Sequence, residues 1–524
     1  MTAPDERTEP MKNGDVGPRA EGLEVSHSDD LRVVDRQAVE EYTNHAVPPS
    51  ARLGRGRVFG GWYSLASAMA FVYYGALSAN LVGNAQALIG LGVVVVTYSL
   101  LGSRAARQAL RTGLNSTLLS RELFGARGAA LCSLLIAAAA TYYAVFESSV
   151  LAAAFQSYFG VWDIRIWYVL IVVGMLPLML GGMQTWLSKL NSISLPLYFL
   201  GVVLAVVVAG VRFGWQGAWS HFQPVPDSHG IPGWLTVFVL YMGVWILFPD
   251  TQDAARMGTS EDAAFHAHVT FGWLYYLVSY AFNGLAGILI VALAGPTGTA
   301  ASEGGVVQGV IRSLGVAGLL VIVVSQVRIN SANFYFASIN IDRFAAQFTQ
   351  RRPSRRAWVV TLAAIVLALM FTDVFSYIAK ALAWQGVLVV SWVAMMIVSW
   401  LFDRGAEVEY RPRRVKALAP GFAVWMVSSG VGIALLQMPD TLPVLSALAP
   451  LVSFALAGAG YAVIRAAGIS GRRATTIPDV RLELSSPWND RVRCAGCDLS
   501  YAGVEMDRDE SGRVLCLECQ ATTV

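Results

Sequence analysis

Long apolar runs recur along this chain and restrict it to a fold built from membrane-spanning helices. Each run has about 20 residues, the length that an α-helix needs to cross the hydrocarbon core of a bilayer. The chain is only 14% charged, whereas a soluble domain has about 25% charged residues. Twelve runs cover residues 59–79, 81–102, 128–155, 165–184, 190–211, 232–249, 269–294, 306–327, 357–373, 379–401, 419–437 and 442–465. We therefore expect an all-α polytopic membrane protein; eleven or thirteen spans are also compatible, because the first two runs are nearly continuous.

Lys and Arg are distributed unequally between the loops that alternate along these runs. With the N-terminus in the cytoplasm, nearly all loop Lys and Arg fall in cytoplasmic loops, and Arg165 and Arg212 fall in the opposite set. Cytoplasmic loops of membrane proteins carry such an excess. The pattern predicts a multi-pass protein of the cytoplasmic membrane with both termini in the cytoplasm. The net charge of +3 then reflects topology and does not indicate nucleic-acid binding.

Polar segments flank the apolar region and suggest four parts. In residues 1–50 acidic residues outnumber basic ones and aromatic residues are few, which predicts a disordered cytoplasmic tail. The membrane domain covers residues 51–467, a linker covers 468–490, and a small cytoplasmic module covers 491–524.

Four cysteines in the C-terminal module are spaced as metal ligands. Cys494 and Cys497 form one CxxC motif, and Cys516 and Cys519 form a second. Two such turns bring four thiolates to one tetrahedral ion, so we expect a structural zinc ribbon, although iron fits the same ligands. A fortuitous Cys-rich tail or a redox pair are the alternatives. Cys132 lies in an apolar run and is expected to be a small buried residue.

Polar residues also occur inside the apolar runs. Tyr143 and Glu147 are four residues apart and therefore share one face of a helix. A carboxylate within a membrane span suggests a functional site; the alternative is a protonated Glu147 hydrogen-bonded inside the bundle. Gly75 lies among aromatic and polar residues, which suggests a discontinuous first span lining a cavity.

Two further polar groups call for different interpretations. Asp250, Asp253 and Arg256 follow the sixth run, and helix capping with an exposed ion pair is the simpler reading. The segment "SQVRINSANFY", residues 325–335, instead follows an apolar run directly. A charge at the bilayer centre costs about 3 to more than 10 kcal/mol, so Arg328 requires compensating interactions.

Several motifs, in order, resemble the nucleobase–cation symporter family, the purine–cytosine and hydantoin or allantoin permeases. They are "TGLNSTLLSRELFGARGA" between spans two and three, "GMQTWLSKLNSISLPL" at spans four and five, "DAARM" after span six and "NSANFYFASIN" at span eight. The resemblance covers roughly residues 51–467.

The resemblance implies a LeuT-type inverted repeat of five plus five spans with two additional helices. It places the substrate between spans one, three, six and eight, with aromatic rings around a flat heterocycle and amides at its edge. Carried onto this chain, the substrate-binding residues are Tyr143, Glu147, Trp245, Asn330, Asn333 and Gln326. The family usually has Trp and Gln where this chain has Tyr143 and Glu147. A carboxylate there favours a substrate edge with N–H donors, or a protonated amine.

The resemblance also implies a cation site between spans one and eight, with Gly75, Glu147 and Arg328 as candidate coupling residues. Arg328 stands where sodium-coupled members have a small hydroxyl residue. A guanidinium has only donors and cannot bind a cation. Arg328 either replaces Na⁺ as a tethered cation bonded to span-one carbonyls, or extends toward the cytoplasmic end of span eight.

These features predict a secondary transporter for a nucleobase-like heterocycle in a lipid bilayer, independent of Na⁺ and coupled to H⁺ or to no ion. One alternative is a transporter-derived sensor or scaffold that contacts a cytosolic protein through the ribbon. Another is an amino-acid or osmolyte carrier of the same fold, which would not need paired aromatic residues. We do not expect an enzyme, because no nucleophile–base pair or phosphate-binding glycine motif is evident.

Overall fold

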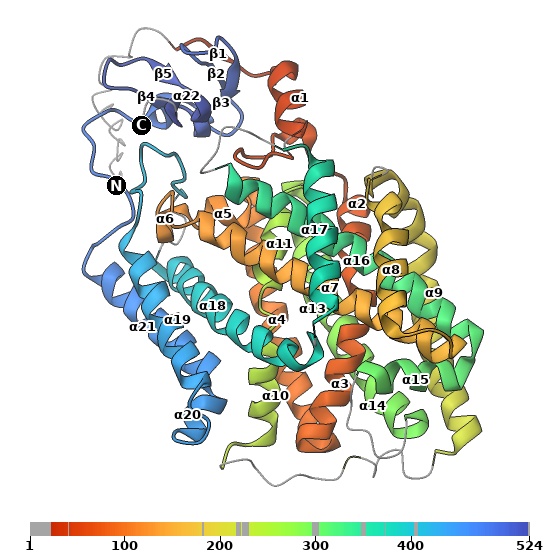
Figure 1. The fold of residues 1–524 in the computed structure, drawn as a ribbon. Coiled ribbons are helices and arrows are strands. Elements are labelled where there is room, and N and C mark those ends of the chain that lie inside the picture. Colours follow the sequence, from red (N-terminus) through yellow and green to blue (C-terminus); the bar gives the residue numbers. More distant parts are fainter. Residues whose placement is uncertain are drawn as a thin grey trace, which may run out of the picture. The chain divides into compact units, whose positions relative to one another are not determined.

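The computed structural model describes residues 23–39, 41–180, 183–215, 222, 230–295, 303–346, 353–372, 374–402 and 407–521 (Figure 1). The chain divides into two compact units. The helical unit is Glu41–Ala474, and the terminal unit combines Met1–Glu40 with Thr475–Val524. The two ends of the chain therefore belong to one unit.

The helical unit contains the spans that the apolar runs predict. Among its described residues, seven helices are long and apolar enough to cross a membrane, and two bent helix pairs raise the number to nine. Three shorter apolar helices, α8, α17 and α19, lie at further predicted runs. The spans are built from α2 (Arg55–Trp62), α3 (Met69–Val82), α4 (Asn84–Thr112), α7 (Ala130–Phe159), α8 (Ile164–Leu180), α9 (Met183–Phe213), α10 (Gly233–Met242), α11 (Leu247–Ala255), α13 (Trp273–Tyr276), α14 (Asn283–Ala294), α16 (Val316–Ala345), α17 (Arg355–Met370), α18 (Val374–Phe402), α19 (Pro420–Leu436) and α21 (Ala449–Ala466). The connecting helices are α5 (Ser116–Leu119), α6 (Arg121–Phe124), α12 (Ala263–Phe265), α15 (Glu303–Leu314) and α20 (Pro443–Ala447).

Glycines in left-handed or related conformations set several helix ends. Gly113 (φ 66°) ends α4 and Gly160 (φ 65°) ends α7, because glycine adopts this conformation without a Cβ clash. Gly315 (φ 60°) separates α15 from α16. Span eight therefore begins at Val316 rather than at residue 306, where the predicted run begins, and Arg328 lies well inside α16.

Spans one and six are both broken. The α2–α3 pair is bent by 45° and the α10–α11 pair by 48°. The break in span one contains a short 3-10 turn, Leu65–Ser67, and ends at Ala68 in an extended conformation. The first spans of the two halves of a five-plus-five inverted repeat occupy equivalent positions, so paired breaks at spans one and six agree with that architecture.

The first span is discontinuous, as the sequence suggests, but the break lies at residues 65–68 and not at Gly75. Gly75 lies inside α3, seven residues after Ala68. A Cβ added at Gly75 would lie 2.2 Å from Cα of Gly284 on α14. The small residue therefore permits close packing of two helix backbones, as small residues do in membrane bundles.

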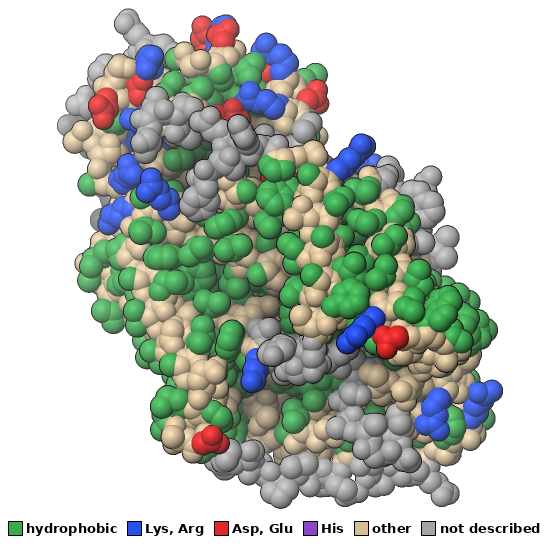
Figure 2. Space-filling view, viewed as in Figure 1, with side chains coloured by type: hydrophobic (Ala, Val, Ile, Leu, Met, Phe, Trp, Pro, Cys, Tyr) green, Lys and Arg blue, Asp and Glu red, His purple; other side chains and the backbone are tan. Residues whose placement is uncertain are grey.

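The surface of the helical unit is suited to lipid. Hydrophobic side chains cover much of the face seen in Figure 2, and charged side chains are sparse over the spans. Large apolar side chains are exposed along α8 and α9, including Val173, Leu200 and Val207. A continuous exposed apolar surface of this kind is typical of contact with the hydrocarbon core of a bilayer.

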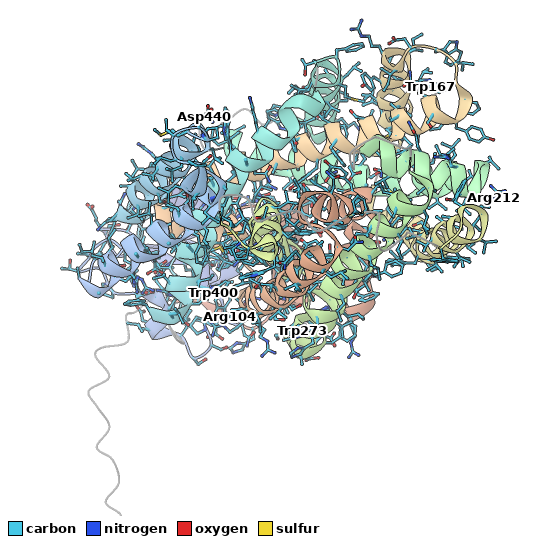
Figure 3. The ribbon with its side chains drawn as sticks, turned by 90° about the horizontal axis from the view of Figure 1, so that it is seen from below. Arg104, Trp167, Arg212, Trp273, Trp400 and Asp440 are labelled. Atoms are coloured by element: carbon cyan, nitrogen blue, oxygen red, sulfur yellow. The ribbon has the colours of Figure 1, made fainter. Side chains whose placement is uncertain are left out.

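Polar and aromatic side chains join span two (α4), span six (α10–α11) and span ten (α18). The Arg104 guanidinium lies 5.2 Å from the ring centroid of Trp400, and these residues are labelled together in Figure 3. Trp400 Nε1 donates a hydrogen bond to Gln108 Oε1 at 2.8 Å. Gln252 Nε2 donates to the same oxygen at 3.1 Å. One acceptor on span two thus connects the other two spans.

The terminal unit is a small β-structure with its own core. Strands β1 (Val25–Ser26), β2 (Arg491–Arg493) and β3 (Ser500–Ala502) form an antiparallel sheet, and β4 (Asp507–Arg508) pairs with β5 (Val514–Leu515). The described part also contains helices α1 (Leu31–Val39) and α22 (Leu517–Ala521) and two 3-10 turns, Val480–Glu483 and Gly503–Glu505. Val33 of α1 is 4% exposed and belongs to the same core as Val492 and Tyr501.

The predicted disorder of residues 1–50 is wrong for the residues that the structure describes. Val25 pairs with Val492 in the sheet, and Arg491 Nε forms an ion pair with Asp29 Oδ1 at 2.5 Å. Residues 41–50 instead belong to the helical unit, where Val47 N donates to Gly113 O at 3.0 Å. Pairing between the two chain ends leaves no trace in local composition, which explains the error; residues 1–22 lie outside the described residues.

We predict that Gly75→Ala destabilises the helical unit, because the new methyl group would overlap the Gly284 backbone. Overpacking of this kind costs about 1–3 kcal/mol. Thermal unfolding of the purified protein in detergent should show a lower midpoint. Gly92→Ala is the matched control, because a Cβ at Gly92 meets nothing within 4 Å. Equal midpoints for the two variants would contradict the close α3–α14 packing.

Candidate functional site

A cavity lies where the two broken spans meet spans three and eight. Four spans line it with the following residues: span one with Leu65, Ala68, Ala70, Phe71 and Tyr74, α7 with Ile136, Ala139, Ala140, Tyr143 and Glu147, span six with Val244, Ile246, Leu247 and Asp250, and α16 with Ile329, Asn333 and Phe336. The polar residues that line it are Tyr74, Tyr143, Glu147, Asp250 and Asn333. The rest of the lining is apolar, as is typical of small-molecule sites.

The sequence of α7 explains how span three reaches the cavity. Ile136, Ala140, Tyr143 and Glu147 are spaced by three or four residues and line the cavity together, so they occupy one face of the helix. Alanines fill the turn before Tyr143 and leave room beside the neighbouring backbone. Tyr143 is held from span ten, because Gln385 Nε2 donates to its hydroxyl at 3.3 Å.

Several buried polar atoms at this site have no hydrogen-bond partner among the described residues. They include Glu147 Oε2, Asp250 Oδ1 and Asn333 Nδ2. Glu147 is 2% exposed and Asn333 is 7% exposed. Buried polar atoms are nearly always paired, and leaving one unpaired costs about 1–3 kcal/mol. Atoms of this kind converging on one cavity indicate a binding site, and they argue against a Glu147 fully satisfied within the bundle.

The structure brings some of the predicted substrate-binding residues together. Tyr143, Glu147 and Asn333 line the cavity. Gln326 is fully buried on α16 and is not among the residues that line the cavity. Its Nε2 and Oε1 have no hydrogen-bond partner among the described residues.

Trp245 does not line the cavity, although the sequence pairs it with Tyr143. The residues of span six that line the cavity are Val244, Ile246, Leu247 and Asp250. Trp245 is 2% exposed and packs edge-on against four rings, those of Tyr98, Phe238, Phe248 and Phe454. Successive side chains point in different directions through the break, so helical spacing could not place this ring.

Asn330 serves helix packing. Its Nδ2 donates to Ser148 Oγ at 2.6 Å and contacts Met175 Sδ at 3.4 Å. These contacts join α16 to α7 and α8. Asn333, three residues later, lines the cavity.

Asp250 is the main residue that the sequence analysis missed. It was assigned to a helix cap near the cytoplasmic face, yet span six continues as α11 to Ala255 and Asp250 lines the cavity. Phe71, Tyr74 and Phe336 were also missed. The sequence does contain a signal for Asp250. This carboxylate directly follows an apolar run and Pro249, one turn after the helix break.

The other two members of that trio are buried rather than exposed. Asp253 Oδ2 forms an ion pair with Arg343 Nη1 at 2.5 Å, and its Oδ1 accepts from the Ser116 backbone and hydroxyl at 2.8 and 2.7 Å. Arg256 donates to the carbonyl oxygens of Tyr42 and Glu41, each at 2.8 Å. This network joins spans six and eight to residues that precede span one.

The carbonyl groups freed by the span-one break are hydrogen-bonded by protein side chains. Ser325 Oγ donates to Ser67 O at 2.5 Å, and Asn283 Nδ2 donates to Ala66 O at 2.8 Å. Asn283 Oδ1 in turn accepts from Tyr198 at 3.1 Å. A serine and an amide thus bind the carbonyl groups that the sequence analysis assigned to Arg328.

Arg328 is deeply buried near this network. It is 1% exposed, so it does not extend to the cytoplasmic end of span eight. It lies three residues after Ser325 on α16, so the two side chains share one face of the helix. Nε and Nη1 of Arg328 have no partner among the described residues.

The terminal unit contains a candidate metal centre. The Sγ atoms of Cys494, Cys497, Cys516 and Cys519 all lie within 4.8 Å of one another. The 3.9 Å between Sγ of Cys497 and Cys516 agrees with about 3.8 Å between ligands of a tetrahedral zinc with Zn–S bonds of about 2.3 Å. The four thiols therefore fit one zinc ion.

Hydrogen bonds prepare Cys494 for metal binding. The Cys516 side chain and then the backbone N–H groups of Cys516 and Gly496 lower the pKa of Cys494. The N–H groups lie 3.2 and 3.3 Å from its Sγ. Metal ligands bind as thiolates, so these bonds favour the form that coordinates.

Comparison with solved structures identifies the fold. The inward-facing conformation of Mhp1 matches with a TM-score of 0.62 at 15% identity, covering 80% of this chain and 92% of that chain. Mhp1, a nucleobase-cation-symport-1 family transporter, in a closed conformation with bromovinylhydantoin bound, matches with a TM-score of 0.59 at 15% identity, covering 80% and 93%. A Na⁺-coupled sialic acid symporter matches with a TM-score of 0.57 at 12% identity, covering 85% and 98%. No family model and no curated protein matches this sequence.

These matches confirm the predicted fold class. The chain has the all-α LeuT-type architecture of membrane-embedded symporters, and its C-terminal part carries a cysteine cluster that fits a zinc-ribbon-like tail.

We predict about one zinc ion per chain in metal analysis of the purified protein. Replacing Cys494 and Cys497 together by Ser should remove the metal and unfold the terminal unit, because binding energy in such sites is folding energy. Cys132→Ser is the control, because Cys132 lies in α7 and should leave the zinc content unchanged. Retention of zinc by the double variant would refute the assignment.

Proposed function

We propose that this protein is a secondary transporter for a small, flat nitrogen heterocycle of the nucleobase or hydantoin type. The observation that carries the proposal is the cavity at the two helix breaks, where unpaired polar atoms of Glu147, Asp250 and Asn333 converge. Bound bromovinylhydantoin in a structure of the same fold supports this substrate class.

The chemistry of the lining suits a planar ring with polar edges. Phe71, Tyr74, Tyr143 and Phe336 line the cavity and provide aromatic surface for stacking. An ionised Glu147 would accept hydrogen bonds from ring N–H or amino groups. Asn333 can both donate and accept. Trp245 lies outside the cavity, so the aromatic surface of the proposed site consists of Phe71, Tyr74, Tyr143 and Phe336.

We further propose that transport does not require Na⁺. The carbonyl oxygens of Ala66 and Ser67 accept hydrogen bonds from Asn283 and Ser325, and the permanent charge of Arg328 is buried nearby. A second cation in this region would meet carbonyl oxygens that are already paired and a like charge. This arrangement agrees with transport that is coupled to H⁺ or to no ion.

A membrane sensor or scaffold is the second candidate, and one observation favours it. The two chain ends fold together into a unit with its own core and metal centre, which a cytosolic protein could bind.

The proposed location is the cytoplasmic membrane with both ends in the cytoplasm. An amino-acid or osmolyte carrier would share the fold; a ligand screen distinguishes it, because it would bind no heterocycle.

We predict that Tyr143→Ala weakens binding of a flat ligand by about 1–3 kcal/mol, the range found for stacking of a base on an aromatic ring. Ligands are screened by thermal shift, since binding to the native state raises its stability; nucleobases, hydantoins and amines form the screen. Tyr142→Ala on the same helix is the matched control, because Tyr142 is not among the residues that line the cavity. An equal loss of affinity in both variants would remove Tyr143 from the site.

Uptake into proteoliposomes tests the coupling. We predict that uptake of the best-binding compound is the same with an inward Na⁺ gradient as with an equal K⁺ gradient, because protein groups already bind the span-one carbonyls. A proton gradient is the parallel condition. Uptake that rises with external Na⁺ would contradict the proposed independence, and the absence of any uptake by a ligand-binding protein would favour the sensor.

A further inference from the structure

The cavity carries acidic groups from two different spans. Glu147 comes from span three and Asp250 from span six. None of the described residues that line the cavity is Lys, Arg or His. Arg343 pairs with Asp253 and Arg256 binds backbone carbonyls, and Arg328 is buried on α16 outside the cavity lining. The site is therefore acidic and lacks an internal counter-charge at its wall.

Both carboxyl groups have an oxygen available to a ligand. Glu147 Oε2 and Asp250 Oδ1 are buried and have no hydrogen-bond partner among the described residues. Tyr143 lines the cavity together with both acids. Two carboxylates in one desolvated cavity repel each other, and a cation between them stabilises the ionised form of both.

The apolar part of the wall also favours a cation. Aromatic residues Phe71, Tyr74 and Phe336 contribute to it beside Tyr143. Aromatic ring faces attract ammonium and guanidinium groups, most strongly where water is excluded. Acidic and aromatic groups together are the chemistry of a site for a planar organic cation.

We propose that the substrate is a flat organic cation, such as an amidinium, a guanidinium or a protonated amino-heterocycle, whose N–H groups bridge Glu147 and Asp250. This inference rests on the proposed transport function and names the substrate class of the same cavity. The alternative substrate is a neutral heterocycle, in which case Glu147 and Asp250 carry exchangeable protons.

Benzamidine and benzamide test the proposal on the purified full-length protein. They have similar shapes, but benzamidine is a cation at neutral pH and benzamide is neutral. Thermal shift and titration calorimetry should show binding of benzamidine at least about tenfold tighter than that of benzamide or of the neutral nucleobase cytosine, the ratio expected for charged hydrogen bonds. This comparison uses the wild-type chain and does not depend on the folding of a variant.

Two variants test whether Glu147 and Asp250 bind the charged group of the ligand. Asp250→Asn and Glu147→Gln keep the side-chain shape and should each weaken benzamidine binding by about tenfold or more. Asp440→Asn is the matched control, because Asp440 is exposed and does not line the cavity. If cytosine binds as tightly as benzamidine and Asp250→Asn changes nothing, the cation proposal is wrong while the transporter proposal stands. If no compound of the screen binds, both are wrong.

Discussion

The need to satisfy backbone polar groups inside a membrane underlies this structure. A helix that breaks within the hydrocarbon region frees carbonyl groups, and these must find donors where no bulk water is present. Here the donors are Ser325 and Asn283, which bind the carbonyl oxygens of Ser67 and Ala66. The two hydrogen bonds connect span one to span eight and to α14, and they allow the chain to keep a break at the centre of the bundle.

The cavity follows from the breaks. Where span one is extended at Ala68 and span six bends after Met242, neither backbone fills the space beside α7 and α16. One carboxylate oxygen each of Glu147, from span three, and Asp250, from span six, then has no hydrogen-bond partner among the described residues. A site of this kind can bind a polar ligand strongly, because the ligand relieves the cost of unpaired buried atoms. The breaks are also natural hinges, since no continuous helix must bend when the site opens to either side.

Sequence patterns predicted the features that depend on local chemistry. Hydropathy placed the spans, the CxxC spacing predicted a cysteine cluster that the structure shows, and helical spacing brought Tyr143 and Glu147 to one face. Features set by distant contacts were not predictable in this way. The residues around Gly75 correctly suggested a discontinuous first span, but the packing of Gly75 against Gly284 depends on a distant contact. Trp245 was expected at the cavity and Asp250 outside it, because side-chain directions change through an irregular segment. The pairing of Val25 with Val492 joins chain ends whose compositions give no sign of it.

Chemical labelling of the cavity tests the central claim most directly. Ala140 lines the cavity and is small, so Ala140→Cys introduces a thiol there, while native Cys132 on the same helix is fully buried and serves as an internal control. Vesicles of each orientation are treated with a membrane-impermeant maleimide, and the α7 peptide is analysed by mass spectrometry. Alternating access predicts that the introduced thiol is labelled from both sides, that the best-binding ligand slows both reactions, and that Cys132 stays unlabelled. Labelling that no ligand slows, or none from either side, would contradict a transport site between the broken spans.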